Sequence, residues 1–481
     1  MVITKWLVPV CIVPRVTQVS RRRRAPVDVL FVNWRDLSHP EGGGSERYVH
    51  RVAEGLAAAG LEVEVFCAAH GDAPAEEVVQ GVRVVRRGGR LGVYPRALLH
   101  VLRRRPRLVV DVQNGLPFCS PLVTRAPVVV LVHHVHREQW PIVFGRLGGA
   151  VGWWLESRLA PWVYRHCRYV TVSGATRTEL AGLGVAPSRV TVVPNGIEPA
   201  PRVAVRRSAA PRLVVLGRLV PHKRVEHALE VLARLEERWP DLTLAVVGEG
   251  WWDERLRAEA ERLGVADRVE FHGFLDEDAK HGQLAAAWVH LCPSVKEGWG
   301  IVVTEAGAHR TPTVGYRSAG GLNESVLDGR TGLLVDDLDG FTAAVERLLA
   351  DGVTRTAMGV AAARHAAGLD WDSSVRAWGG VLASARADAG TGGSAAVAVL
   401  QDVDRRLVAL LDGGAVGVHH GGDARDDGDT GTGTGTEGQQ DGQEGLHAAT
   451  SFPEGRRRSA TVDADTVIHN AAPATAPSAA P

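Results

Sequence analysis

Short apolar runs alternate with helical patterns through the first part of the chain. Residues 27–33 read as a buried strand, and Tyr48, Val52 and Leu56 repeat at helical spacing just beyond them. Further strands are predicted at 62–67, 82–86, 108–112, 128–132, 169–172 and 190–193. Apolar runs of this length between helices are typical of parallel sheets covered on both faces.

The pattern pauses and then restarts. Residues 198–211 contain three prolines and no apolar period, which indicates a linker. Beyond it, strands are predicted at 212–217, 242–247, 268–272, 289–292 and 313–315, with helices at 225–238, 252–263, 276–287 and 301–309. We therefore predict an α/β chain with two tandem, doubly wound, Rossmann-like domains, at 26–200 and 212–370, joined by a linker at 201–211.

Both ends of the chain depart from this pattern. Residues 1–25 hold an apolar stretch interrupted by Pro9 and Pro14, and we interpret them as a disordered or over-called extension. Residues 371–390 are predicted to form a closing helix. Residues 391–481 become rich in Gly, Asp, Thr and Gln, so we expect a disordered tail, since too little apolar surface is available to offset the entropy of ordering.

Charge and cysteine content narrow the class of protein. Lys and Arg together number 55, and Asp and Glu also number 55, which argues against a dedicated nucleic-acid binder. The five cysteines are scattered without a C-x-x-C pair, so neither a disulfide framework nor a zinc ribbon is predicted, and a cytoplasmic location is expected. Lysine occurs only at positions 5, 223, 280 and 296, so each lysine calls for a reason.

The most specific chemical signal is the segment 292–307. A strand ends at Cys292, a turn containing Gly298 follows, and a helix is predicted to begin near Gly300. Glu297 lies just before this helix and Glu305 about one turn inside it. Free amides at a helix start attract negative or polar ligand groups, and two carboxylates there can accept hydrogen bonds from sugar hydroxyls.

This segment resembles the Glu-x7-Glu motif of the retaining glycosyltransferases of family 4, which have the GT-B architecture. Gly217-Arg218-Leu219, followed by Lys223, is similar to the element of that family that grips the donor diphosphate. Other matching segments occur in the same order at 193–197, 247–250, 269–274, 320–324 and 329–334. The resemblance covers about 27–385 and implies two domains facing a central cleft, with the closing helix crossing back to the first domain.

The resemblance also implies roles for individual residues. Glu305 would accept hydrogen bonds from the donor ribose, and Glu297 would contact the transferred sugar. The donor-binding set would be completed by Gly298, Trp299, Gly300 and Ile301. A transferase also needs positive charge where the diphosphate leaves, and Arg218 and Lys223 suit that task chemically.

The first domain supplies two further candidates. The loop 42–45 follows a strand and opens a helix, so the amides of Gly43 and Gly44 could face a phosphate, although a plain tight turn is the alternative. His133 resembles the family histidine that reaches the donor sugar, with His134 as the second choice and a structural role for both still open. Ser173 resembles a family position near the cleft.

His133, His134 and His136 could also be considered as metal ligands, but no carboxylate or cysteine at useful spacing completes the set. The family lacks a catalytic metal. We therefore predict no metal and no cofactor besides the nucleotide-diphosphate sugar, which is the donor substrate.

Residues 140–164 interleave tryptophans with arginines. One interpretation is an amphipathic helix resting peripherally on a bilayer, at the inner face of the plasma membrane, which would suit a lipid-linked acceptor. A helix packed on its own domain is the alternative.

The predicted function is transfer of a hexose, mannose or glucose, to a hydroxyl of a glycan, lipid-linked or small-molecule acceptor. A noncatalytic nucleotide-sugar-binding homologue and a dinucleotide oxidoreductase are the rivals. The second is disfavoured because neither glycine-rich loop has dinucleotide spacing.

Overall fold

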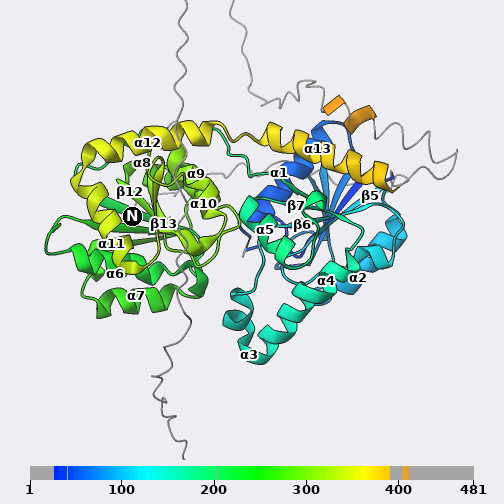
Figure 1. Ribbon diagram of the computed structural model, residues 1–481, viewed down its shortest axis with the longest axis horizontal. Coiled ribbons are helices and arrows are strands. Elements are labelled where there is room, and N and C mark those ends of the chain that lie inside the picture. The colour runs from blue at the N-terminus through cyan, green and yellow to red at the C-terminus, as the bar shows by residue number, and fades with distance from the viewer. Residues whose placement is uncertain (1–25, 41, 202, 390–404, 408, 411–481) are drawn as a thin grey trace, which may run out of the picture. The chain divides into compact units, whose positions relative to one another are not determined.

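The computed structural model describes residues 26–40, 42–201, 203–389, 405–407 and 409–410. Within these residues the strands form two separate sheets (Figure 1). The predictions for residues 1–25, and for nearly all of 391–481, lie outside the described residues.

The first sheet has eight strands in the order β3-β4-β2-β1-β5-β6-β7-β8, and every adjacent pair is parallel except β3 with β4. The strands are β1 (Val29–Val32), β2 (Val63–Cys67), β3 (Glu76–Val79), β4 (Val82–Arg86), β5 (Leu108–Val112), β6 (Val128–Val132), β7 (Arg168–Thr171) and β8 (Val190–Val192). The strand order reverses direction between β1 and β5. At such a point, loops at the carboxyl ends of the strands diverge and leave room for a ligand.

The central strand β1 shows why its sequence reads as a continuous apolar run. Val29 and Phe31 face one hydrophobic core, while Leu30 and Val32 face another. Helices α1 (Gly44–Ala58) and α13 (Trp371–Asp388) complete the first core, and α2 (Val93–Arg104), α4 (Ala160–Val163) and α5 (Gly174–Gly182) contribute to the second. A parallel strand buried on both faces has no polar face, so its sequence does not alternate.

The second sheet has six parallel strands in the order β11-β10-β9-β12-β13-β14. They are β9 (Arg212–Leu216), β10 (Thr243–Val247), β11 (Val269–Gly273), β12 (Val289–Cys292), β13 (Thr313–Tyr316) and β14 (Gly332–Val335). The helices of this part are α6 (Val225–Leu235), α7 (Asp253–Arg262), α8 (Glu277–Ala286), α9 (Ile301–Ala308), α10 (Leu322–Ser325), α11 (Leu338–Ala350) and α12 (Gly352–Ala367). The strand order reverses between β9 and β12, the strands that precede the predicted diphosphate and Glu-x7-Glu segments.

Helix α13 follows the second sheet in the sequence but packs on the first. It lies beside α1 (Figure 1), and the Nε1 of Trp378 donates to the hydroxyl of Tyr48 at 2.8 Å. That hydroxyl in turn donates to the carbonyl oxygen of Val193 at 3.0 Å. Just before α13, the amide of Ile197 donates to the carbonyl oxygen of Leu369 at 2.9 Å, so the two segments that connect the sheets run side by side.

Candidate active site

The predicted site residues follow four parallel strands. Gly43 and Gly44 follow β1, His133 follows β6, Arg218 and Lys223 follow β9, and Glu297 follows β12. Carboxyl ends of parallel strands lie at one edge of a sheet, so each sheet brings its own candidates together.

Close contacts then join the candidates of the two sheets. A Cβ atom on Gly43 would lie 3.7 Å from Nε of Arg218, and one on Gly44 would lie 3.0 Å from Cδ1 of Ile301. A Cβ on Gly298 would come within 2.5 Å of the carbonyl oxygen of His133, so no side chain fits there. The glycines thus let four loops approach one another in pairs, and each pair joins a residue of the first half of the sequence to one of the second.

An ion pair stands at the centre of this group. The Nζ of Lys223 lies 2.5 Å from Oε1 of Glu297, which also accepts a hydrogen bond from Oγ of Ser294 at 2.7 Å. Burial opposes ionisation of Glu297, but the charge of Lys223 and these two hydrogen bonds outweigh it and lower the pKa of the carboxyl. Glu297 is therefore a buried carboxylate held in its charged form.

The second carboxylate of the motif, Glu305, has partners that the sequence did not identify. Its Oε1 lies 2.9 Å from Nζ of Lys280 on α8 and 3.2 Å from Nη1 of Arg47 on α1. Both cations also reach Glu277, Lys280 at 2.7 Å and Arg47 at 2.9 Å. Arg47 thereby connects α1, the helix that follows the first Gly-rich loop, to α9, the helix that carries Glu305.

The scarcity of lysine was the signal that could have found these partners. Lys280 is buried and pairs with Glu305, and Lys296 is buried and pairs with Glu179 on α5. Together with Lys223, every lysine of the described residues therefore contacts a carboxylate in or next to the candidate site. Arg47 carried no such signal, because arginine is abundant in this chain.

The Gly43–Gly44 loop differs in one detail from the expectation. The amide of Gly43 donates to Oε2 of Glu46 at 2.8 Å, which is the hydrogen bond of a helix-capping box. Burial opposes ionisation of Glu46, but Arg35, Ser45, this amide and Arg218 lower the pKa of its carboxyl. In this structure the Gly43 amide therefore serves a protein carboxylate, which occupies the kind of position that an anionic ligand group would take.

The three neighbouring histidines have different surroundings. His133 is buried and its Nε2 has no hydrogen-bond partner among the described residues, while burial lowers its pKa to about 4. Burial also lowers the pKa of His134 well below its usual value, and its Nε2 lies 3.1 Å from Nε2 of Gln139. His136 pairs with Glu156 at 2.9 Å. His133 is thus the member of the set that has an unsatisfied polar atom beside the group of candidates.

Ser173 begins α5, where its Oγ accepts a hydrogen bond from the amide of Thr176 at 3.2 Å. The next two amides, of Gly174 and Ala175, donate to the carboxylate of Glu324 at 2.8 and 2.9 Å. Glu324 comes from α10 of the second half, so the start of α5 is a further contact between the two halves.

Among the described residues, one group has the spacing for a metal ion, and it is not the histidine cluster. Ligand atoms of Glu277, His281 and Glu305 lie within 4.8 Å of one another. Lys280 and Arg47 already contact these carboxylates, so a cation bound there would have to displace two protein cations. The chemistry of this group is therefore that of an ion-pair network.

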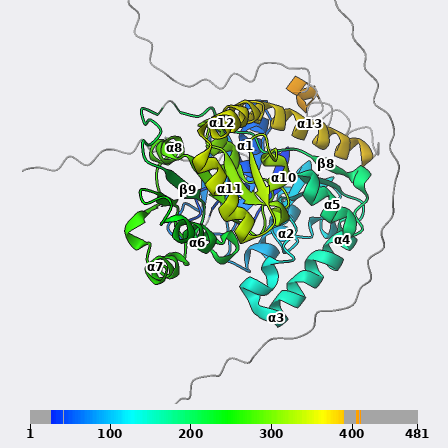
Figure 2. The same cartoon turned by 60° about the vertical axis from the view of Figure 1, so that its left-hand side comes forward.

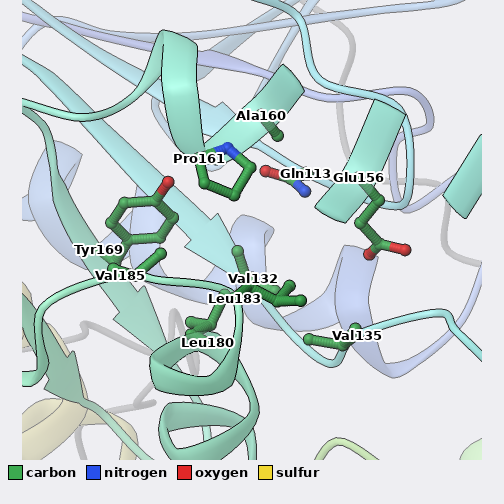
Figure 3. A pocket seen from close by; sticks show the side chains of 10 residues that line it. All are labelled: Gln113, Val132, Val135, Glu156, Ala160, Pro161, Tyr169, Leu180, Leu183 and Val185. Atoms are coloured by element: carbon green, nitrogen blue, oxygen red, sulfur yellow. The ribbon is translucent and has the colours of Figure 1, made fainter. Parts of the chain in front are cut away.

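A small hollow inside the first half lies apart from these residues (Figure 3). It has room for about one water molecule, and it contains none of the predicted site residues. Its lining is Gln113, Val132, Val135, Glu156, Ala160, Pro161, Tyr169, Leu180, Leu183 and Val185.

Comparison with known proteins places this geometry in a family. Residues 42–200 match the family model Glycosyltransferase Family 4, and residues 198–365 match the model Glycosyl transferases group 1. The chain is 30% identical over 363 residues to a glycogen synthase of Mycobacterium tuberculosis, an alignment that covers 67% of this chain and 86% of that protein. The chain belongs to glycosyltransferase family 4.

Other relatives and solved structures fit this assignment. This family 4 glycosyltransferase is 42% identical, over 170 residues, to a GDP-mannose-dependent alpha-(1-6)-phosphatidylinositol monomannoside mannosyltransferase of Mycolicibacterium smegmatis, covering 34% of this chain and 44% of that one.

Its fold matches sucrose-phosphate synthase of Thermosynechococcus elongatus with a TM-score of 0.63 at 20% identity, covering 74% of this chain and 98% of that chain. Anabaena HepE in complex with UDP-glucose matches with a TM-score of 0.59 at 19% identity, over 74% and 99% of the two chains. The predicted GT-B fold class is thus confirmed.

No helix among the described residues of this glycosyltransferase has the length and apolar character needed to cross a membrane.

The network around Glu305 predicts the effect of Lys280→Met. This substitution leaves Glu305 buried with Arg47 as its remaining cation, so the free energy of unfolding should fall by about 3 kcal/mol. Adding Glu305→Gln should restore part of the loss, because the buried carboxylate that has lost one of its two cations is then replaced by a neutral amide. Urea unfolding measures both. Arg238→Met breaks an exposed pair with Glu346 and should change stability by less than about 1 kcal/mol. Equal effects of the two single variants would contradict the network.

Buried histidines predict acid sensitivity. Burial lowers the pKa of His133, His222, His290 and His309 from 6.5 to about 4. The unfolded chain takes up these protons near pH 6.5, whereas the folded chain takes them up only near pH 4. The free energy of unfolding should therefore fall as the pH drops from 6.5 towards 4, by about 1 kcal/mol per pH unit for each of the buried His133 and His290, and by less for the partly exposed His222 and His309, where solvent screens the effect. Urea unfolding across this range measures the slope, and His222→Gln should reduce it. An unchanged slope in that variant would contradict the assignment.

Proposed function

We propose that this family 4 glycosyltransferase is a retaining, metal-independent enzyme that moves a hexose from a nucleotide-diphosphate sugar to a hydroxyl acceptor. The observation that carries the proposal is the Lys223–Glu297 pair beside Arg218, Gly298 and His133. In this arrangement a lysine cation lies beside polar groups that follow strands of both sheets, which supports the proposal.

The reaction explains why cations are needed there. Cleaving the bond between the sugar and the diphosphate leaves a highly charged nucleoside diphosphate, and positive groups held in place stabilise the charge as it develops. Arg218 offers a planar fork that suits two phosphate oxygens, and Lys223 offers a compact charge. We assign the diphosphate to these two residues, and a metal ion is then not needed for charge neutralisation.

The remaining roles follow the resemblance, residue by residue. Glu305 binds the ribose hydroxyls, which requires its contacts with Lys280 and Arg47 to leave part of the carboxylate accessible to the donor. Glu297 accepts hydrogen bonds from the transferred sugar, and the amides of Gly298, Trp299 and Gly300 orient it. Ile301 opens helix α9, whose first amides have no partner from a preceding helical turn.

His133 completes the site on the side of the first sheet. Its buried Nε2 has no hydrogen-bond partner among the described residues, and we assign this atom to a hydroxyl of the donor sugar. Its lowered pKa keeps the ring neutral at pH 7. The neutral ring can therefore form a hydrogen bond with the sugar without adding a second positive charge that would compete with Lys223 for the diphosphate.

Retention of configuration needs no protein nucleophile in this scheme. Glu297 is already bound by Lys223 and Ser294, so it is suited to holding the sugar in place rather than attacking it. The acceptor hydroxyl approaches from the face on which the diphosphate departs, and a leaving phosphate oxygen takes the hydroxyl proton.

The relatives guide the choice of substrates. The mannosyltransferase relative acts with GDP-mannose on a phosphatidylinositol mannoside, and HepE was crystallised with UDP-glucose. We infer mannose or glucose as the transferred sugar, and a lipid-linked or cell-envelope glycan as the acceptor. A cytoplasmic location agrees with the free thiols of Cys67, Cys119, Cys167 and Cys292.

A binding experiment distinguishes this function from its rivals. The chain is heated with UDP, GDP, ADP or NAD, each with EDTA and with Mg²⁺. A ligand present at about 100 times its Kd raises stability by about 2.7 kcal/mol, which gives a clear thermal shift. We expect a shift with one nucleoside diphosphate, unchanged by EDTA. A shift with NAD alone would favour the oxidoreductase, and a requirement for Mg²⁺ would overturn metal independence.

Substitutions then test catalysis. Arg218→Ala, Lys223→Ala and Glu305→Ala should each lower transfer at least tenfold, equivalent to about 1.4 kcal/mol of barrier, because each removes a contact to the donor. Transfer is measured with the nucleotide sugar identified by the thermal shift. Arg238→Ala removes an exposed arginine elsewhere and should leave transfer unchanged. Normal transfer in all three site variants, or nucleotide binding without transfer in the native chain, would favour the noncatalytic homologue.

A further inference from the structure

The segment 139–165 forms a helical hairpin on the first half of the molecule. Helix α3 (Gln139–Trp154) is broken at Gly145, whose φ of 68° and ψ of −174° are not helical. Its second part folds back on the first: a Cβ on Gly149 would lie 2.9 Å from Cα of Pro141, and one on Gly152 would overlap the ring of Trp140. Glycines therefore let the two parts pack without intervening side chains.

The outer side of this hairpin is apolar. Of the sixteen large hydrophobic side chains exposed among the described residues, seven lie in this short segment. They are Ile142, Val143, Phe144, Leu147, Val151, Trp154 and Trp162, and Leu147 is 86% exposed. Six of them lie on α3, and we call these six residues the apolar tip; Trp162 lies on α4. In two views α3 lies beyond α4, at the far end of the segment that the two helices form (Figure 1, Figure 2).

The exposed charges around the apolar tip are mainly positive, and Glu138, just before the hairpin, is the exposed acid. Arg146, Arg158 and Arg165 are exposed. The one acidic residue between 139 and 165 is Glu156, which is buried. Its carboxylate accepts hydrogen bonds from the ring of His136 at 2.9 Å and from Nε1 of Trp140 at 2.7 Å. The carboxylate thus fastens the hairpin to the body of the protein, and the exposed charged residues within 139–165 are all arginines.

The inner side of the segment packs against the first sheet and its loops. Glu156, together with Ala160 and Pro161, borders the small hollow that is also lined by Val132 of β6 and by Gln113, just after β5 (Figure 3). The hairpin is therefore attached through buried polar and apolar contacts, and it presents its apolar tip as a preformed surface. Exposed apolar surface of this extent is typical of an interaction site.

We infer that the apolar tip docks on a lipid bilayer rich in anionic lipids. Tryptophan prefers the boundary between headgroups and acyl chains, and arginines beside it pair with anionic headgroups. A second copy of the chain is a poorer occupant, because a symmetric contact would place these arginines near their own copies, with Glu138 as the one exposed carboxylate next to the hairpin in the sequence.

Docking on a bilayer rests on the proposed function in one respect: it explains how a lipid-linked acceptor reaches the active site. The hairpin begins three residues after His136, in the loop that also carries His133, and α3 packs against Pro221–Lys223. A bilayer bound at the tip would hold a lipid-linked acceptor on the same side of the protein as this loop. Binding to the membrane does not require sugar transfer, so an experiment can contradict membrane docking without contradicting the proposed transferase activity.

Co-sedimentation of the full chain with vesicles tests the inference. We expect binding to vesicles of phosphatidylcholine with phosphatidylglycerol, weaker binding to phosphatidylcholine alone, and loss of binding as salt is raised. Combined Leu147→Glu and Val151→Glu should lower the vesicle-bound fraction at least tenfold. Val353→Glu and Trp251→Glu, at equally exposed apolar positions elsewhere, should bind as the native chain does.

Three outcomes would overturn docking: no binding to anionic vesicles, native binding by the Leu147 and Val151 variant, or equal loss in the control variant. Thermal unfolding of each variant shows whether it is folded, and Arg146→Gln with Arg158→Gln supplies a milder change that should weaken binding to anionic vesicles only. A concentration-dependent dimer that the tip variant abolishes would favour a second copy instead. The nucleoside-diphosphate thermal shift, unchanged in the tip variant, separates failure of docking from failure of the proposed function.

Discussion

A buried carboxylate must be matched by a cation, and this requirement organises the middle of the molecule. Glu297 and Glu305 sit among residues from both sheets, where an unpaired charge would be strongly unfavourable. Lys223 and Lys280 supply the matching charges over short distances. A sugar or ribose hydroxyl can then bind to carboxylates that are already ionised and already held in position.

The same requirement connects the two halves of the sequence. Arg47 of α1 reaches Glu277 and Glu305, while Lys296 reaches Glu179 on α5 and Glu324 accepts from the first amides of that helix. Each of these contacts joins residues more than a hundred positions apart. The site is therefore assembled from pairs that become neighbours only after both sheets have formed.

The fold was largely predictable because most strands are buried on both faces. Residues 108–112 and 128–132 were predicted with the observed bounds, since runs made of valine and leucine, broken only by Asp111, have few alternatives. Two strands were missed. Strand β3 is a half-buried edge strand that contains two glutamates, and β14 begins with a glycine, so neither reads as an apolar run.

The candidate site was predictable only as far as its residues lie in local motifs. Glu297, Glu305, Arg218 and Lys223 occur at spacings that a sequence displays. Arg47 and Lys280 act through contacts at long separation, which no local pattern records, although the rarity of lysine pointed to Lys280. The capping bond from the amide of Gly43 to Glu46 also escaped notice, because a glycine-rich loop before a helix reads equally well as a ligand loop and as a self-contained cap.

The position of α13 has a consequence for how the chain folds during synthesis. Trp378 and Val375 belong to the hydrophobic core that also holds Phe31 and Tyr48, so the first sheet is not fully covered until α13 has been made. All strands of the second sheet will therefore have been synthesised while the face of the first sheet that holds Phe31 is still not covered by α13. The first half of this protein is continuous in space but not in sequence, and it becomes complete only after the second half.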